Sequence, residues 1–286
     1  MVSWGFNEWG QLGDGTTVNR LVPVLVNTGP GSALVGKKVV AIAAGTFHNL
    51  ALCSDGTLLA WGYNENGQLG DGTTNSSLIP VAVAVNSPAS ALKGKVITKV
   101  AAGGSMSAVL CADGSMATWG ENLWGGLGDG FYVDRHLPTA VDASPASSAL
   151  SGKRAVRIAV GRDFCLALCV DGSLVAWGGN AEWGQAGDGS ELNHASPVTV
   201  NLAPGSSGLA GKTVVDISAG GWHSLALCSD GTTAGWGWNT CGQLGDGTKT
   251  DRRTPVATSS SLFTRGEAFV GISGGSLHTL ALVAEP

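Results

Sequence analysis

Short apolar segments alternate with glycine-rich turns along the whole chain. In the first repeat the apolar segments lie at residues 22–26, 39–44, 50–53 and 58–61. Segments of this length that are partly β-branched and bounded by Gly, Asp and Pro predict β-strands, and four strands in a repeat are typical of a propeller blade. Segment 39–44 is apolar at successive positions, which predicts a sheet packed on both faces between two neighbouring blades.

A motif of the form Trp-Gly-x-Asn-x-x-Gly-Gln-Leu-Gly-Asp-Gly follows the last segment of each repeat. Close copies of it begin at Trp4, Trp61, Trp119, Trp177 and Trp236. Successive copies are 57 to 59 residues apart. A repeat of this period indicates a propeller or a solenoid, in which neighbouring repeats share one core. We therefore predict a single propeller domain over residues 1–286.

The two ends of the chain each contain part of a repeat. Residues 2–5 correspond to a fourth strand, and residues 280–283 correspond to a third strand. Joining these ends would complete one more blade and leave no open sheet edge. The sequence therefore predicts an all-β fold, a five-bladed β-propeller of four-stranded blades that is closed by the N-terminal strand completing the last blade. The alternative is an excerpt from a longer array of repeats.

The composition narrows the classes of partner. Glycine supplies 45 of the 286 residues and charged residues supply 13%, which fits a turn-rich globular chain. The formal net charge of −5 provides no basic face for nucleic acid. No stretch approaches the roughly 18 consecutive apolar residues of a membrane span. We expect a monomer that binds neither nucleic acid nor a membrane.

The cysteines are expected to be unpaired. Four of the six occupy the same place in successive repeats, two residues before an Asp-Gly turn: Cys53, Cys111, Cys169 and Cys228. One cysteine per repeat predicts small apolar core residues rather than bonded pairs. Cys165 would lie about 13 Å from Cys169 along an extended strand, too far for a bond. Free thiols, and a Met1 that leads into the first motif without a signal peptide, favour the cytoplasm.

These repeated residues carry a resemblance to a known family. The segment Ala-Gly-x-x-His-x-Leu-Ala-Leu-Cys-x-Asp-Gly-Thr, followed by the tryptophan motif, resembles the repeat of the regulator of chromosome condensation family in its bacterial style. The match recurs five times and covers essentially the whole chain. The resemblance implies a β-propeller that binds another protein through a face or rim. Family members include a nucleotide exchange factor for a small GTPase, a plant ultraviolet receptor and a secreted β-lactamase inhibitor. Five repeats in place of the familiar seven, without a basic tail, make chromatin binding and guanine-nucleotide exchange less expected here.

Residues that recur in every repeat are expected to be structural. The Gly-x-Leu-Gly-Asp-Gly segments lack the Gly-Lys-Ser or Gly-Lys-Thr ending of a phosphate loop. Their aspartates are therefore predicted to form turns: Asp14, Asp71, Asp129, Asp188 and Asp246. Histidine occupies one equivalent position in three repeats: His48, His223 and His278. Met106 and Phe164 take this position elsewhere, which predicts packing inside the blade rather than a zinc site. No metal or cofactor is expected.

Function is expected where the repeats differ. Two variable positions precede the histidine position, and they include Phe47, Arg162, Asp163 and Trp222. A second variable set lies inside the tryptophan motif and includes Trp9, Tyr63, Trp124, Trp183 and Trp238. Aromatic side chains on loops supply rigid contact area for a protein partner, or a stacking surface for sugars. The alternative is that they cover the blade ends as peripheral core, with Arg162 and Asp163 as a surface ion pair.

We therefore predict a non-enzymatic binding module that recognises a protein partner through these nine residues. The alternatives are lectin-like carbohydrate binding by the loop tryptophans, and a hydrolase in the propeller channel. A glycoside hydrolase needs two carboxyl groups that face each other roughly 5 to 9.5 Å apart. The candidate carboxylates fall on separate repeats, and nothing in the sequence pairs them: Glu8, Glu65, Glu121 and Glu182. Every Ser, Cys and His candidate for a catalytic triad recurs as part of the repeat.

Overall fold

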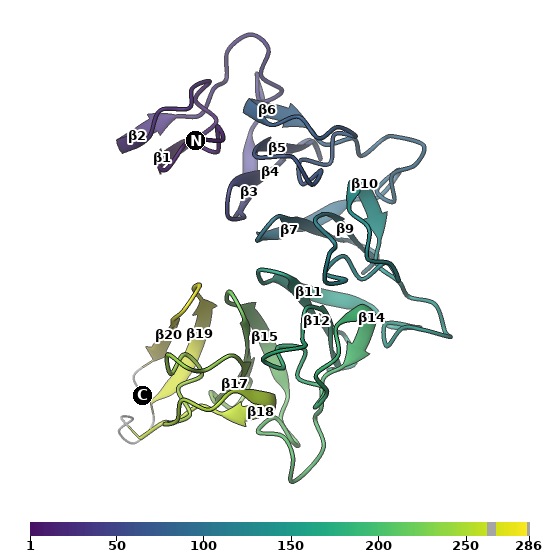
Figure 1. Cartoon of the computed structure of the whole chain (residues 1–286), viewed down its shortest axis with the longest axis vertical. Coiled ribbons are helices and arrows are strands. Elements are labelled where there is room, and N and C mark those ends of the chain that lie inside the picture. Colours follow the sequence, from purple (N-terminus) through teal and green to yellow (C-terminus); the bar gives the residue numbers. More distant parts are fainter. Residues whose placement is uncertain (262–266, 285–286) are drawn as a thin grey trace. The chain divides into compact units, whose positions relative to one another are not determined.

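The computed structural model describes residues 1–261 and 267–284, and the regular structure of these residues is β-strand throughout. Their strands form four sheets of four strands and two sheets of two strands (Figure 1). No helix in this part of the chain has the length and apolar character needed to cross a membrane. The chain divides into two compact units: unit 1 is Met1–Leu123 with Tyr132–Val141, and unit 2 is Trp124–Phe131 with Asp142–Pro286.

Unit 1 contains a two-stranded sheet and two four-stranded sheets, with antiparallel neighbours in chain order. The two-stranded sheet pairs β1 (Val2–Gly5) with β2 (Arg20–Leu25). The first four-stranded sheet contains β3 (Val39–Ala44), β4 (His48–Cys53), β5 (Leu58–Gly62) and β6 (Ser77–Ala82). The second contains β7 (Ile97–Gly103), β8 (Met106–Cys111), β9 (Met116–Gly120) and β10 (Arg135–Ala140).

Unit 2 repeats the same plan with two four-stranded sheets and one two-stranded sheet. The first sheet contains β11 (Ala155–Val160), β12 (Phe164–Cys169), β13 (Leu174–Gly178) and β14 (His194–Thr199). The second contains β15 (Val214–Ala219), β16 (His223–Cys228), β17 (Thr233–Gly237) and β18 (Arg252–Ala257). The two-stranded sheet pairs β19 (Ala268–Gly274) with β20 (Thr279–Ala284). Such four-stranded antiparallel meanders are the sheets from which propellers are built.

The boundaries of the blades differ from the prediction by one strand. The sequence predicted that the segment after each tryptophan motif begins a new blade, whereas β6 pairs with β5 as the last strand of the same sheet, with Leu59 opposite Ala82. The motif loop explains this, because the Asn64 side chain closes it: Nδ2 donates to the carbonyls of Thr73 and Asn75, and Oδ1 accepts the Leu69 N–H. The closed loop returns the chain alongside the strand that it left.

The predicted closed ring of five blades is not established by these sheets. The first and last sheets, β1–β2 and β19–β20, are separate two-stranded sheets, and the described strands include no sheet that joins β1 to β20. The N-terminal segment was expected as a lone fourth strand, but it contributes a third and a fourth strand. The C-terminal segment supplies a first and a second strand. These assignments follow from the shifted blade boundary, because each terminal sheet has two of the four strands of a blade.

The core of each unit lies on the two middle strands of the blades. Strands β5, β8, β9, β12, β13, β16 and β17 are buried along their whole length. The first strands of the blades are more open: in β3, Val40 and Ile42 are exposed, so the predicted burial of both faces is wrong for this strand. A first strand has a hydrogen-bonded neighbour on one side only. Five of the six cysteines are buried, and all six are free, as predicted.

Four framework tryptophans each hold the motif loop of one repeat against the third strand of the next sheet. The Trp119 indole Nε1 donates to the Gln68 carbonyl at 2.9 Å, and the Trp177 indole Nε1 donates to the Gly126 carbonyl at 3.0 Å. A Cβ on Gly70 would lie 2.5 Å from Trp119 Nε1, so only glycine fits beneath the indole there. Both indoles are fully buried, whereas Trp4, the equivalent residue of β1, is 61% exposed.

The aspartates of the motif form turns, as predicted. Asp14 Oδ1 accepts the backbone N–H of Thr16 at 3.0 Å, and Asp71 Oδ1 accepts that of Thr73 at 2.9 Å. A carboxylate that bonds the backbone two residues ahead stabilises a tight turn. The following glycine has positive φ, for example 85° at Gly15, which a residue without Cβ adopts at little cost.

The histidine position is buried in two of the three repeats that carry it. His48 Nε2 lies 2.9 Å from Ser107 Oγ, whose hydroxyl donates to the Gln68 carbonyl at 2.8 Å. Because the Ser107 hydroxyl donates its proton to that carbonyl, it accepts a hydrogen bond from His48 Nε2. His48 Nδ1 has no hydrogen-bond partner. Burial lowers the pKa of His48 to about 4. His223 is buried in the same way, but His278 is exposed. Its predicted burial is wrong because it precedes β20, which has no third strand beside it.

Candidate functional site

The sequence-predicted aromatic residues of unit 1 form one cluster. Trp9 and Tyr63 meet edge to face with ring centroids 4.8 Å apart, and Phe47 lies 6.5 Å from Tyr63. Phe6, which the prediction left out of the binding set, joins the cluster at 5.9 Å from Phe47. The Tyr63 hydroxyl donates to Glu65 Oε2 at 2.7 Å. We call Phe6, Trp9, Phe47 and Tyr63 the unit-1 cluster.

A second aromatic cluster lies in unit 2 and consists of three indoles. Trp183, Trp222 and Trp238 contact one another pairwise, with ring centroids 5.4 to 6.0 Å apart. Offset and edge-to-face aromatic pairs contribute about 0.5 to 1.5 kcal/mol each beyond the burial of their area. We call these three residues the unit-2 cluster. Because they come from three different loops, the cluster ties those loops together.

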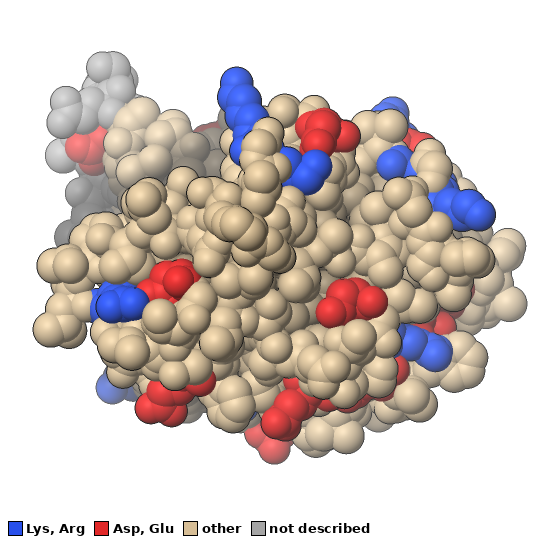
Figure 2. All heavy atoms as spheres, turned by 90° about the horizontal axis from the view of Figure 1, so that it is seen from above, with Lys and Arg blue, Asp and Glu red and all other residues tan. Residues whose placement is uncertain are grey.

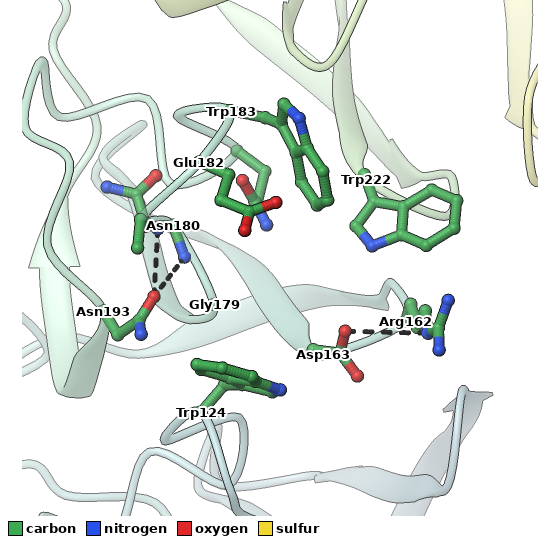
Figure 3. Close-up of a pocket in the computed structure, with 11 residues that line it drawn as sticks. Trp124, Arg162, Asp163, Gly179, Asn180, Glu182, Trp183, Asn193 and Trp222 are labelled. Carbon is green, nitrogen blue, oxygen red and sulfur yellow. Dashed lines mark hydrogen bonds and ion pairs between the residues drawn. The ribbon is translucent and has the colours of Figure 1, made fainter.

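A pocket opens beside the unit-2 cluster. Its volume is about 260 Å³, and Trp183 and Trp222 line one side (Figure 3). Trp124 lines the opposite side and is 45% exposed. Asp163 lies between Trp124 and Trp222, with Arg162 next to it (Figure 3). Five of the nine predicted site residues therefore line one pocket, and a sixth, Trp238, supports it through the indole contacts.

The turns between the first two strands of each blade position these side chains. Arg162 and Asp163 form the turn between β11 and β12, and Trp222 lies in the turn between β15 and β16. The Arg162 N–H donates to the Gly221 carbonyl at 3.1 Å, which links the two turns. The Asp163 carbonyl accepts the Gly179 N–H at 2.8 Å, so the motif loop that carries Trp183 starts from a fixed point.

An amide network holds the motif loop at the pocket. Asn193 Oδ1 accepts the backbone N–H groups of Asn180 and Ala181, at 2.8 and 3.0 Å. In the other four repeats the equivalent side chains also accept the N–H of the motif asparagine: Asn19, Ser76, Asp134 and Asp251. Asn193 also accepts a second backbone N–H, that of Ala181, and its repeat is the one that contains an inserted residue. Asn193 was not among the predicted site residues, and the inserted residue was the signal in the sequence that could have pointed to it.

Charge in the pocket is carried by one adjacent pair of side chains and one carboxylate. The Arg162 guanidinium lies 4.9 Å above the Trp222 ring, within the range of a cation–π contact. Arg162 Nε is 3.7 Å from Asp163 Oδ2, which is an ion pair but too long for a hydrogen bond. Burial raises the pKa of Asp163, and the neighbouring Arg162 partly opposes that rise. The third charged group, Glu182, is exposed at the rim.

The lining residues combine aromatic faces with polar and charged groups. They comprise three indoles, two carboxylates, one guanidinium and several amides, and they include no His, Ser, Cys or Lys. Indole faces bind flat, apolar or cationic groups, and the polar groups orient them. On the face of the molecule shown in Figure 2, Lys and Arg are interspersed with Asp and Glu over a surface made mostly of other residues. The pocket is thus the described feature with the most defined chemistry.

Comparison with known proteins places the chain among named relatives. Residues 1–285 match the family model described as the RCC1-like domain. The ultraviolet-B receptor UVR8 of Arabidopsis thaliana is 34% identical over 280 residues, which cover 98% of this chain and 58% of that protein. The human E3 ubiquitin-protein ligase HERC2 is 32% identical over 257 residues, which cover 89% of this chain and 5% of that protein. The chain therefore spans little more than half the length of the first relative and a small fraction of the second.

Two solved structures share the fold. Human WBSCR16 superposes with a TM-score of 0.80 at 24% identity, over 99% of this chain and 67% of that one. Yeast RCC1 (Prp20), in a crystal structure with Kap60 bound, superposes with a TM-score of 0.78 at 24% identity, over 99% of this chain and 62% of that one. At this identity the likeness establishes the arrangement of the strands and says nothing of the chemistry of the pocket.

Proposed function

Because this chain belongs to the RCC1-like domain family of β-propellers, we propose that it is a non-enzymatic module that binds a protein partner through the pocket and the indoles of unit 2. One observation carries the proposal: six variable residues from several loops converge on a single partly exposed aromatic surface. The repeats hold their framework residues constant and vary these positions. Loops that vary on a rigid scaffold are where binding residues are commonly found.

The energetics of indoles suit such a role. Tryptophan and arginine are enriched among residues that dominate protein interfaces, because they bury large areas at a small cost in side-chain entropy. Here Trp124 is 45% exposed, so a partner could bury much of its remaining surface. The contacts among Trp183, Trp222 and Trp238 hold those indoles before binding, which reduces the entropy lost on association.

Two of the similar proteins support a binding role. The Arabidopsis relative is named as a receptor, and yeast RCC1 has been crystallised with the protein Kap60 bound. HERC2 is named as a ligase, but this chain matches only 5% of its length. Ligase activity therefore does not carry over, and we propose no catalytic residues.

The test compares the two aromatic clusters. A Trp124→Ala/Trp183→Ala double variant and a matched Trp9→Ala/Phe47→Ala variant of unit 1 are used as bait for proteins of the source lysate, after equal melting has been confirmed. We expect a captured protein to be lost with the first variant and kept with the second. Equal capture by both variants and the wild type would contradict the proposal. Quenching of tryptophan fluorescence by free sugars, with no captured protein, would favour the carbohydrate-binding alternative.

A second candidate function is a response to ultraviolet-B light. The plant relative is named for it, and the three indoles of unit 2 lie with ring centroids no more than 6.0 Å apart. Indoles absorb ultraviolet light, and closely spaced rings exchange excitation. Partner capture is measured before and after illumination of the wild type and of Trp222→Phe. A change in the wild type alone supports this function, and identical capture by all four samples rejects it.

We also propose that β1–β2 and β19–β20 complete one another as the fifth blade of a closed ring. In unit 2, Gln243 borders a cavity of about 350 Å³, and its carbonyl accepts the Thr279 hydroxyl at 2.8 Å. The equivalent carbonyls of Gln68 and Gln185 each accept a serine hydroxyl and also a framework indole. Trp4 is the framework indole that is exposed, and it has the right position in the repeat to fill that cavity.

Replacement of Trp4 tests the closed ring. If its indole is seated, Trp4→Ala should lower the free energy of unfolding by about 3 to 5 kcal/mol, as expected for a buried tryptophan. Trp9→Ala, from the same end of the chain, is the control for a partly exposed indole. Deletion of residues 1–5 should reproduce the loss. An unfolding free energy that Trp4→Ala leaves unchanged would refute closure and favour the longer array.

A further inference from the structure

We propose that the pocket of unit 2 binds an alkylammonium group, namely a lysine side chain of the partner protein in its free or methylated form. This inference rests on the proposed function and adds the chemistry of the residue that is recognised. It follows from the walls of the pocket, from a carboxylate found in one repeat only, and from the size of the pocket.

The walls are suited to a cation. Three indoles line the pocket: Trp124 on one side, and Trp183 and Trp222 on the other (Figure 3). The face of an indole attracts a cation within about 6 Å, and such contacts strengthen when the cation loses water. Several indoles around one pocket add these attractions. They also shield the bound group from solvent.

The protein's own Arg162 shows that this surface attracts a cation. Its guanidinium lies 4.9 Å from the centre of the Trp222 ring and 3.7 Å from the Asp163 carboxylate. The Arg162 side chain is 57% exposed, so it covers the outer edge of the site rather than filling it. The space between Asp163 and Trp124 belongs to the pocket (Figure 3). A second cation placed there would meet the inner side of the same carboxylate.

Asp163 distinguishes this repeat from the others. The equivalent positions hold Phe47, Ser105, Trp222 and Leu277. The Asp163 side chain is only 22% exposed, and its one ion pair is too long for a hydrogen bond. A half-buried carboxylate with so weak a partner gains stability from a cation at closer range. Glu182, at the rim, gives the lining two carboxylates against one guanidinium. The balance of charge in the pocket is therefore negative.

The volume points to a side chain rather than a free metabolite. Small-molecule sites usually measure about 300 to 1,000 Å³, and this pocket has about 260 Å³. The end of a lysine side chain, with or without methyl groups, fits such a space, and the rest of the partner would lie on Trp124 and Glu182 outside. A neutral side chain of similar size would leave Asp163 half-buried without a new partner, so discrimination by charge is expected.

The test uses three probes on the full chain: Nα-acetyl-lysine methylamide, its trimethylammonium form, and the neutral norleucine analogue. Indole N–H resonances are followed in nitrogen-15 labelled protein and assigned with single Trp→Phe variants. We expect saturable shifts of Trp124, Trp183 and Trp222 with one or both cationic probes, and none with norleucine. Asp163→Asn should weaken binding about tenfold, which corresponds to about 1.4 kcal/mol. Asp216→Asn is the matched control, because it removes a carboxylate of unit 2 that pairs with Arg157.

Each result of this experiment decides the question. Stronger shifts with the trimethylated probe identify a methylated lysine, and stronger shifts with the primary amine identify a free lysine. Equal binding of norleucine, equal binding by Asp163→Asn, or no indole shift with any probe overturns the inference. The proposed function survives those results if partner capture still depends on Trp124 and Trp183. It fails on its own if capture does not depend on them, even where the cationic probes bind.

Discussion

The two aromatic clusters use equivalent loops and reach different chemistry. In unit 1, Phe47 occupies the turn before the second strand and packs its ring against Phe6 and Tyr63. In unit 2, Trp222 occupies this position in the cluster and also packs against neighbouring rings, but the turn of the preceding sheet carries Asp163, and both residues line an open pocket. An aromatic ring at this position extends the cluster, whereas a short carboxylate leaves space and adds charge. The comparison indicates that the fold supplies the positions of the loops, and that a carboxylate in a neighbouring turn adds a charged side to an aromatic cluster.

The largest expected effect concerns the frame that both clusters share. Trp177 is fully buried and its indole N–H donates to the Gly126 carbonyl, so Trp177→Ala should lower the free energy of unfolding by about 3 to 5 kcal/mol. Trp9 is 39% exposed, and Trp9→Ala should cost about 1 kcal/mol. Urea unfolding of both variants measures the difference. Equal losses of unfolding free energy would mean that Trp9 contributes as much to the core as the framework residue Trp177.

The buried histidine position gives the next largest effect, through pH. His48 begins β4, the equivalent position of β12 in unit 2 holds Phe164, and burial lowers the pKa of His48 to about 4. The unfolded chain takes up this proton near its ordinary pKa of about 6.5, whereas the folded chain does not. The stabilisation is therefore complete above about pH 6.5 and falls by about 3 kcal/mol as the pH approaches 4.

His48→Phe tests this effect, because phenylalanine is the residue that the equivalent position of unit 2 accepts. Urea unfolding between pH 7 and about 4 should show a smaller loss of stability in the variant than in the wild type. His223 is also buried, and burial lowers its pKa to about 4, so the slope should be reduced and not abolished. Parallel curves for the variant and the wild type would contradict the assignment of His48 as a neutral core residue.

Exchange of the turn residues tests the comparison itself. Asp163→Phe should fill the pocket with a ring and add about 1 kcal/mol of stability through apolar burial, while it removes binding of the lysine probe. Phe47→Asp should open the unit-1 cluster and lower stability by about 1 to 2 kcal/mol. Thermal unfolding and probe titration measure the two outcomes. Probe binding that survives Asp163→Phe would show that the pocket chemistry lies elsewhere than in this residue.

Much of the fold could be predicted from the sequence, because the same motif occurs in five repeats. The motif loop, the turn aspartates and the free cysteines all followed from residues that recur. The blade boundary could not be read in the same way. A periodic pattern of strands does not show which strand begins a blade. The Asn64 hydrogen bonds that return the chain along β5 are seen only in the structure.

The candidate site was predicted as a set of residues but not as two groups. Trp183 and Trp222 were predicted because they occupy variable positions. Their contact, however, depends on how the loops of two successive sheets are arranged in space. Asn193 was missed because its role is to accept backbone N–H groups, and Asn, Ser and Asp all fill that role at the equivalent positions. Asp163 supplies one of the charges of the pocket, and its importance depends on the rings that line the pocket with it. The sequence thus identified the variable residues, while the structure assigns their neighbours.

The smallest expected effect tests the polar edge of the unit-1 cluster. The hydrogen bond to Glu65 is the main reason why the pKa of Tyr63 is raised, to about 12. The neutral phenol is the donor in that bond, so its loss of a proton costs the contact and places two negative charges together. Glu65→Gln removes the charge and should bring the pKa of Tyr63 back toward its ordinary value of about 10. The sequence has two tyrosines, so titration of tyrosinate absorbance in a Tyr132→Phe background isolates Tyr63. An unchanged midpoint would show that Glu65 does not hold the hydroxyl. In that case the polar edge of the unit-1 cluster would be open to solvent, unlike the half-buried Asp163 of unit 2.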